Sequence, residues 1–288
     1  MRRPLFIAEA SSNHGRDLSR ALAFVDAAAD IGCDAVKFQL FRIARMFAPE
    51  ILQQSEQHRA REAWELPLAH LPALAERCRA RKIGFSCTPF YVEAVAELAP
   101  YVDFYKIASY EILVQPLLVA CGRSGKPVVL STGMASESEI DAAVATLRVS
   151  GCDDLSLLHC VSAYPTPVDQ ANLAAIDSLR QRTGCPVGWS DHTRRPAVIW
   201  RAVQRWQAAV VEFHLDLDGA GAEYAAGHCW LPHEIAPVIA GIRESLLADG
   251  DGRKVSQPCE REDSNWRADP TDGMRPFKHI RLTWEKAA

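Results

Sequence analysis

Short runs of β-branched, aromatic and other apolar residues alternate along most of the chain with longer alanine-rich segments. The strand-like runs lie at residues 5–10, 35–40, 84–88, 104–109, 127–132, 155–160, 186–191 and 210–215. The segments between them repeat their apolar positions with a helical period, as in Leu18 to Ile31, Leu71 to Arg81, Glu137 to Ser150 and Ala197 to Gln207. Eight strands that each precede a helix predict an α/β fold, a (β/α)8 TIM barrel, as one catalytic domain over residues 1–247.

An open doubly wound sheet is the alternative architecture. It is disfavoured because the turn after the first strand, Ser11-Ser-Asn-His-Gly15, lacks the glycine spacing of a dinucleotide site. The connection over residues 41–66 is unusually long and polar, and it contains Trp64. Such an insertion is either a cover over an active site or a passive surface excursion, and the sequence leaves both interpretations open.

The alternating pattern breaks down after about residue 247. Ala248 to Arg253 resembles a turn-rich linker, and the remaining residues to 288 are polar. A segment of this length is too short for another ordinary domain. We therefore expect residues 248–288 to form a C-terminal extension that packs on the barrel or on a partner subunit.

Composition narrows the class of protein. With 288 residues of which 48% are hydrophobic, the chain can bury a large core. Its net charge of −4, without a basic block, does not indicate binding to nucleic acid or to a membrane surface. No apolar run is long enough to span a bilayer, and the first apolar run meets Glu9 too early for a signal peptide. Nine cysteines without a Cys-x-x-Cys pair predict reduced, buried thiols in a cytoplasmic protein.

Two segments near the end of the pattern each place a histidine two residues after a polar side chain. Ser190 precedes His192 in one, and Glu212 precedes His214 in the other. In a strand this spacing turns both side chains to the same face. On consecutive strands of a barrel the two imidazoles and the carboxylate would converge as a divalent-metal site. The alternative is that each histidine only makes a hydrogen bond inside the core.

Further polar residues interrupt the apolar strands. Lys37 and Lys106 lie within the second and fourth runs, where a buried cation calls for an anionic partner. A buried ion pair with Glu9 or Glu111 would satisfy each lysine. Hydroxyl groups also end several strands, which favours a cradle for a phosphate or an oxyanion. These hydroxyl-bearing residues are Thr88, Ser131, Ser162 and Tyr164.

Seven blocks of sequence together resemble the sialic acid synthase (N-acetylneuraminate synthase) family. The blocks occur in the family's order over roughly residues 5–245. They are Ile7-Ala-Glu9 with Asn13-His14, Asp34-Ala-Val-Lys-Phe-Gln39, Thr88-Pro-Phe90, Tyr105-Lys-Ile-Ala-Ser109, Leu130-Ser-Thr-Gly-Met134, Ala163-Tyr-Pro-Thr-Pro167 and Ser190-Asp-His-Thr193.

The resemblance implies a transferase of carbohydrate biosynthesis with a barrel fold. It would condense phosphoenolpyruvate with an open-chain sugar aldehyde, giving a nonulosonic-acid-like 3-deoxy-2-keto sugar acid and phosphate. His192 and His214 would bind Mn²⁺ or Mg²⁺, and the protein would be a homodimer. The residues implied around phosphoenolpyruvate are Lys37, Thr88, Lys106, Ser109, Ser131, Ser162, Tyr164 and Ser190. Glu9, Glu111 and Glu212 would lie near the sugar and the reacting carbons, with Glu111 a reasonable base for the attacking water.

The chain departs from the family pattern at three places. Ser162 stands where the sialic acid branch usually has asparagine, and the Gly-Pro-Asp segment after His214 is replaced by Gly219 to Trp230. The family's C-terminal antifreeze-like domain, which delivers an arginine to the sugar, is expected to be absent. We therefore expect an acceptor other than N-acetylmannosamine, and an arginine of the extension could replace the missing one. The candidates are Arg253, Arg261, Arg267 and Arg275.

Two other functions fit the same residues. A pyruvate-dependent aldolase or lyase could use Lys37 or Lys106 to form a Schiff base. A non-catalytic protein that binds phosphoenolpyruvate or a sugar is the other alternative.

Overall fold

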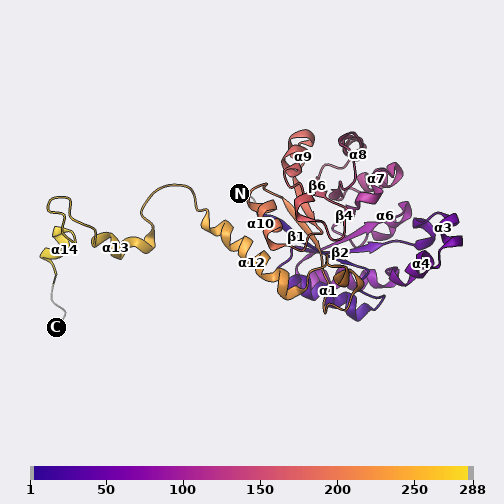
Figure 1. Cartoon of the computed structure of the whole chain (residues 1–288), viewed down its shortest axis with the longest axis horizontal. Helices are drawn as coiled ribbons and strands as arrows, with labels where there is room; N and C mark the ends of the chain where they lie inside the picture. Colours follow the sequence, from indigo (N-terminus) through magenta and orange to yellow (C-terminus); the bar gives the residue numbers. More distant parts are fainter. Residues whose placement is uncertain (1–2, 285–288) are drawn as a thin grey trace. The chain divides into compact units, whose positions relative to one another are not determined.

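The computed structural model describes residues 3–284, in which eight parallel strands close into a barrel (Figure 1). Each strand pairs with its neighbours in chain order, and β1 closes the ring against β8. The strands are β1 Leu5–Ser11, β2 Ala35–Leu40, β3 Gly84–Pro89, β4 Phe104–Ile107, β5 Val128–Ser131, β6 Leu155–Cys160, β7 Val187–Asp191 and β8 Val210–His214. The predicted TIM barrel is therefore confirmed.

Helices follow the strands and surround the barrel. The longer ones are α1 Leu18–Asp30, α5 Leu71–Arg81, α6 Val92–Leu98, α7 Gln115–Gly122, α8 Glu137–Val149, α9 Ala175–Thr183, α10 Pro196–Gln204 and α12 Pro232–Ala248. Short helices on the connections are α2 Ile43–Met46, α3 Pro49–Gln54, α4 Glu56–Arg59, η1 Ala60–Trp64, η2 Leu68–His70, η3 Ser109–Glu111, η4 Val168–Gln170 and α11 Ala222–Ala226. Among the described residues, no helix combines the length and the apolar character needed to cross a membrane.

Local sequence signals account for several boundaries. Asp17 caps α1 by accepting from the amides of Ser19 and Arg20. Ser136 and Glu139 form a capping box at the start of α8. The prediction extended the fourth strand to residue 109, but β4 ends at Ile107 because Ser109 begins the helix η3.

The barrel interior changes from apolar to polar along the strands. One apolar layer crosses the interior, formed by Ile7, Ala35, Val129, Leu158 and Val210 with Phe104 packed against them. Side chains two positions further along a strand point to the same face. On these six strands the next positions hold Glu9, Lys37, Ser131, Cys160, Glu212 and Lys106. The polar layer therefore lies toward the carboxyl ends of the strands, the usual place for a barrel active site.

Gly188 allows β7 to approach its neighbours closely. A Cβ atom there would press on the carbonyl oxygen of Val210 and lie 2.8 Å from Leu158 Cδ2. We expect Gly188→Ala to lower the free energy of unfolding by about 2–3 kcal/mol, because the added methyl group has no space in the core. Chemical denaturation measures the change, with Ser156→Ala on β6 as the control. Equal stability of Gly188→Ala and the unmodified protein would contradict this account.

The chain divides into two compact units, one ending at Leu246 and the other beginning at Leu247. The second unit contains η5 Pro258–Glu260, α13 Arg261–Asn265 and α14 Lys278–Leu282. Within it, the rings of Trp266 and Trp284 meet edge to face with 5.2 Å between their centroids. The packing of this extension on the barrel or on a partner subunit stays a prediction. All nine cysteines are free and only Cys259, in the extension, is exposed.

Candidate active site

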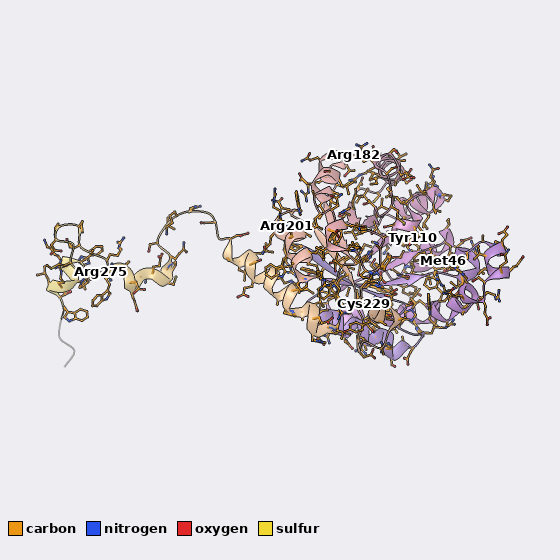
Figure 2. All side chains as sticks on the ribbon, in the orientation of Figure 1. Met46, Tyr110, Arg182, Arg201, Cys229 and Arg275 are labelled. Carbon is orange, nitrogen blue, oxygen red and sulfur yellow. The ribbon has the colours of Figure 1, made fainter. Side chains whose placement is uncertain are left out.

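A cavity of about 250 Å³ opens at the carboxyl ends of the barrel strands. Met46 and Tyr110, labelled in Figure 2, both line it. Ten of the predicted site residues also line it, namely Glu9, Lys37, Lys106, Ser109, Ser131, Tyr164, Ser190, His192, Glu212 and His214. The structure thus gathers most of the predicted site, while the individual roles of these residues stay predictions.

Three predicted residues lie outside the lining of the cavity. Thr88 is fully buried and accepts a hydrogen bond from Lys37 Nζ at 3.1 Å, so it positions the lysine. Ser162 is half-buried beside Gly133. Glu111 lies on η3, where one of its carboxylate oxygens is buried.

Two lysines and two glutamates form a buried charge network on the cavity floor. Lys37 makes an ion pair with Glu9, and its Nζ lies 4.0 Å from Glu212 Oε2. Lys106 Nζ lies 3.4 Å from Glu212 Oε1, which also accepts from Ser190 Oγ at 3.1 Å. The expected buried ion pairs are therefore present, although Lys106 contacts Glu212 in place of Glu9 or Glu111.

Burial and charge move the pKa values of this network in different directions. Burial lowers the pKa of Lys37 to about 8, although the Glu212 carboxylate opposes the change. Burial alone would raise the pKa of Glu212, but Lys106 and Lys37 hold it at about 2. Glu212 is thus an anion at neutral pH, and Lys37 can lose its proton in mildly alkaline solution.

A small cradle of hydroxyl groups surrounds Gly133. The Gly133 amide donates to Ser109 Oγ at 3.0 Å. A Cβ atom on Gly133 would press on Ser162 Oγ and lie 2.8 Å from Cys160 Sγ. The buried hydroxyl oxygens of Ser131 and Ser162 make no hydrogen bond to any residue in the range 3–284. Because a buried hydroxyl without a partner is costly, this cradle is suited to a bound anion.

Glu111 combines a buried carboxylate with a raised pKa. Its Oε2 has no hydrogen-bond partner within the described part of the chain. Burial raises the pKa of Glu111 to about 7, against the opposing charges of Lys106 and Lys37. A carboxylate with this pKa can accept a proton near neutral pH.

The two predicted metal-binding histidines come together at the ends of β7 and β8. Their ring centroids are 5.4 Å apart. His192 Nδ1 donates to the carbonyl of Val161 at 2.8 Å, and His214 Nδ1 lies 2.8 Å from Glu223 Oε2. Burial, and then the nearby His214, lower the pKa of His192 to about 3. A neutral His192 that donates from Nδ1 keeps its Nε2 lone pair, so the donor set fits a divalent cation.

Sequence reasoning missed three residues near these histidines. Glu223 lies on α11, and His228 and Cys229 follow it in the segment that joins β8 to α12. Together with His214 they offer ligand atoms that all lie within 4.8 Å of one another. They follow no strand period, and the only signal was that this segment departs from the family pattern.

The long connection after β2 contributes one wall of the cavity. Phe41, Ile43, Met46, Arg61 and Trp64 all line it. The Arg61 guanidinium lies over the Trp64 ring, 5.3 Å from its centroid. Residues 41–66 are therefore part of the cavity wall, and their role as a cover stays a prediction.

Comparison with known proteins places the chain in a family. The NeuB family matches residues 24–254. The N,N'-diacetyllegionaminic acid synthase of Campylobacter jejuni is 34% identical over 92% of this chain and 83% of its own. The spore coat polysaccharide biosynthesis protein SpsE of Bacillus subtilis is 32% identical over 88% of this chain and 71% of its own. The crystal structure of N-acetylneuraminic acid synthetase from Leptospira borgpetersenii matches with a TM-score of 0.78 and 33% identity, over 91% of this chain and 90% of that one.

These similarities agree with the sequence blocks and with the site. The family match spans most of the barrel, and the relatives whose activity is named are synthases. The chain therefore belongs to the NeuB family and is an enzyme of the sialic acid synthase type, as its sequence blocks indicated.

Proposed function

We propose that this cavity condenses phosphoenolpyruvate with the open-chain aldehyde of a sugar, giving a 3-deoxy-2-keto sugar acid and phosphate. The observation that carries the proposal is the pairing of two buried lysines with unpartnered hydroxyls around Gly133. Phosphoenolpyruvate carries a phosphate and a carboxylate, so its binding needs several cations and hydrogen-bond donors close together. The names of the relatives support the same reaction class.

The floor of the cavity would bind the donor. Lys37 and Lys106 supply positive charge, and Ser109, Ser131 and Ser162 supply hydroxyl donors. The ion pairs with Glu9 and Glu212 hold both ammonium groups in place before the substrate arrives. Positioning of this kind lowers the entropic part of the barrier.

Condensation then forms one carbon–carbon bond and one carbon–oxygen bond, to water, and breaks the carbon–oxygen bond between C2 and the phosphate. C3 of phosphoenolpyruvate attacks the aldehyde carbon, and the aldehyde oxygen takes up a proton. Water adds at C2 and gives up a proton to Glu111, and the adduct then collapses to a ketone as phosphate leaves with the proton of the new hydroxyl. When bound at His192 and His214, a divalent cation would polarise the aldehyde.

The acceptor would enter past the cover formed by residues 41–66. The apolar side chains there and the cation of Arg61 favour a sugar that carries both polar and acyl groups. Arg61, which belongs to the barrel unit, could contact the sugar in the role that was expected of an arginine in the extension. The arginines of the extension, the homodimer, the cytoplasmic location and the choice of Mn²⁺ or Mg²⁺ stay predictions.

Release of inorganic phosphate tests the reaction. We expect phosphate to appear only when phosphoenolpyruvate, a divalent cation and an amino-sugar aldose are all present. Mass spectrometry of the product should show the three pyruvyl carbons added to the aldose. Phosphate release that is the same without any aldose, or none with a broad panel of aldoses, would reject the proposal.

Gly133→Ala should weaken donor binding specifically. The added Cβ occupies the space between Ser162 and Cys160, so we expect the KM for phosphoenolpyruvate to rise by about tenfold or more, as for the loss of about 1.4 kcal/mol of binding. The KM for the acceptor should change little. Gly125→Ala is the control, because its positive φ makes the substitution costly to the fold while its turn has open space and lies outside the cavity lining. An unchanged KM for phosphoenolpyruvate would show that the cradle does not hold the donor.

A pyruvate aldolase is the second candidate, favoured by one observation. The lowered pKa of Lys37, about 8, makes its amine easier to deprotonate and hence more nucleophilic. Such an enzyme would form a Schiff base with pyruvate, and borohydride would trap it at Lys37. Absence of a covalent adduct by mass spectrometry would exclude this mechanism.

A further inference from the structure

The segment between β8 and α12, residues 215–231, brings three potential metal ligands to His214. We refer to it as the β8 loop. Glu223, His228 and Cys229 each offer one atom, and with His214 these atoms lie within 4.8 Å of one another. His214 and Glu223 line the cavity, whereas His228 and Cys229 are buried and are not part of its lining. The cluster thus extends from the active site into the protein.

One carboxylate oxygen is the centre of this cluster. Glu223 Oε2 lies 2.8 Å from His214 Nδ1, 3.4 Å from Cys229 Sγ and 3.7 Å from His228 Nε2. The other oxygen, Oε1, accepts a hydrogen bond from Ser11 Oγ. Two imidazoles, a carboxylate and a thiol around one point are the ligand types of a borderline transition-metal ion.

His228 provides a second sign of a missing ligand. Its side chain is 7% exposed, and its Nδ1 has no hydrogen-bond partner among residues 3–284. Its ring lies 5.0 Å from the rings of both His214 and Tyr164. The ring nitrogen that faces the cluster is Nε2, and at 3.7 Å from Glu223 Oε2 it is too far for a hydrogen bond, so a cation between them would give this imidazole a partner.

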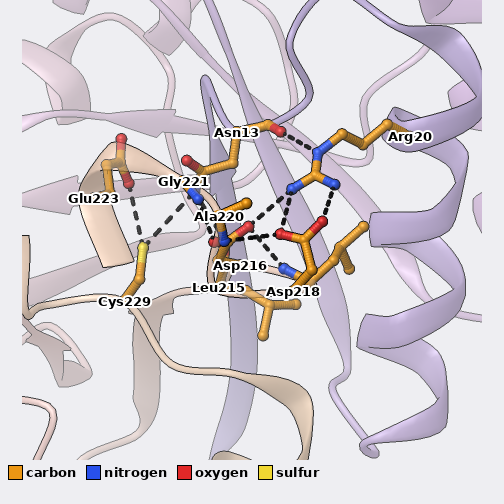
Figure 3. Close-up of polar contacts among 10 residues, drawn as sticks. Asn13, Arg20, Leu215, Asp216, Asp218, Ala220, Gly221, Glu223 and Cys229 are labelled. Carbon is orange, nitrogen blue, oxygen red and sulfur yellow. Dashed lines mark hydrogen bonds and ion pairs between the residues drawn. The ribbon is translucent and has the colours of Figure 1, made fainter. Parts of the chain in front are cut away.

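The β8 loop is held in place by a network of hydrogen bonds, shown in Figure 3. Arg20 Nη2 donates to Asp216 at 3.0 Å, and Arg20 Nη1 donates to Asp218 at 2.7 Å. Asp216 in turn accepts from the Gly221 amide at 3.0 Å, next to the start of α11. Asn13 Nδ2 donates to the carbonyl of Leu215 at 3.1 Å and contacts Cys229 Sγ at 3.7 Å. This network fixes the ligands before a metal binds, which lowers the entropic cost of binding.

We propose that the β8 loop completes the cation site of this enzyme, so that His214, Glu223, His228 and Cys229 bind one zinc-like transition-metal ion next to His192. The inference deepens the proposed function, because it names the class of cation that the same site takes. Mg²⁺ fits this donor set least, since it prefers oxygen ligands. On binding, the Cys229 thiol gives up its proton to solvent and the thiolate coordinates the ion.

Cobalt(II) is the probe, because its absorption spectrum reports its ligands directly. The full chain is freed of metal with a chelator and titrated with Co²⁺ in the absence of substrates. We expect the visible absorption bands of protein-bound Co²⁺ and a near-ultraviolet charge-transfer band from the thiolate. Mg²⁺ in large excess should not displace Co²⁺, whereas Zn²⁺ should. A spectrum of the unmodified protein without the charge-transfer band would overturn the inference, whatever the variants do.

Three variants test the individual ligands. Cys229→Ser should lose the charge-transfer band, and His228→Asn and Glu223→Gln should each weaken Co²⁺ binding by about tenfold or more. Cys259→Ser and His233→Asn are the matched controls, because both residues are exposed and outside the cluster. Thermal unfolding of the metal-free variants checks that they fold. Co²⁺ affinity and spectrum that are unchanged in Cys229→Ser or in His228→Asn would overturn the four-ligand site.

Metal binding and catalysis can fail separately in these experiments. The titrations contain neither phosphoenolpyruvate nor a sugar, so they do not depend on the proposed reaction. An enzyme that releases phosphate but binds Co²⁺ equally well without His228 would keep its function and lose this site. A protein that binds Co²⁺ through all four residues but releases no phosphate would keep the site and lose the function.

Discussion

Lys106→Met should lower kcat/KM for phosphoenolpyruvate by about a thousandfold, which corresponds to about 4 kcal/mol. Lys106 is 3% exposed, and its ammonium group lies 3.4 Å from Glu212. Removing this cation takes away a contact to the anionic donor. It also leaves the more distant Lys37 as the lysine paired with Glu212, so the cavity becomes more negative and binds an anion less well.

Steady-state kinetics with varied phosphoenolpyruvate measure this effect. Lys254→Met, in the exposed extension, is the control and should leave kcat/KM unchanged. Because a buried charge is being removed, thermal unfolding should be recorded for each protein. A folded Lys106→Met variant within tenfold of the unmodified activity would show that Lys106 serves the fold and not the donor.

Glu111→Gln should lower kcat by about 10²- to 10⁴-fold, the usual contribution of a general base. Glutamine keeps the size of the side chain but cannot accept a proton from the attacking water. Donor binding should be little affected, so the KM for phosphoenolpyruvate should stay nearly constant. Glu76→Gln, on the exposed surface of α5, is the matched control.

The pH profile separates Glu111 from a structural role. Its carboxylate is the active form and its pKa is raised to about 7, so kcat/KM should fall as the pH drops below 7. Lys37 is active as a cation and its pKa is lowered to about 8, so kcat/KM should also fall above pH 8. Glu111→Gln should lose the acid limb and keep the alkaline one. An acid limb that persists in this variant would assign it to another group.

The strand order and most of the cavity could be predicted from residue patterns. Lys37 and Lys106 stand out because charges in apolar strands are rare, and the period of two sends them to the same side as Glu212. His192 and His214 were found in the same way. Position along a strand translates directly into position in a barrel, since neighbouring strands have a fixed register.

The loops carried the residues that sequence reasoning missed. Glu223 lies on a five-residue helix and Cys229 beyond it, so no regular period relates either of them to His214. Their position depends on contacts from distant parts of the chain, such as those of Asn13 and Arg20. Gly133 was missed as a binding residue for a different reason: it has no side chain to bind a ligand, and its role is to leave space between Ser162 and Cys160.

The layer of Ile7, Ala35, Val129, Leu158 and Val210 has a consequence for the order of events in catalysis. It plugs the barrel, so small molecules reach the lysines from one end only. A sugar bound beneath the cover would then block the path of phosphoenolpyruvate to these lysines. Turnover should accordingly be sequential, with the three-carbon donor loading ahead of the aldehyde, and high aldose concentrations should slow the enzyme by trapping it without its first substrate.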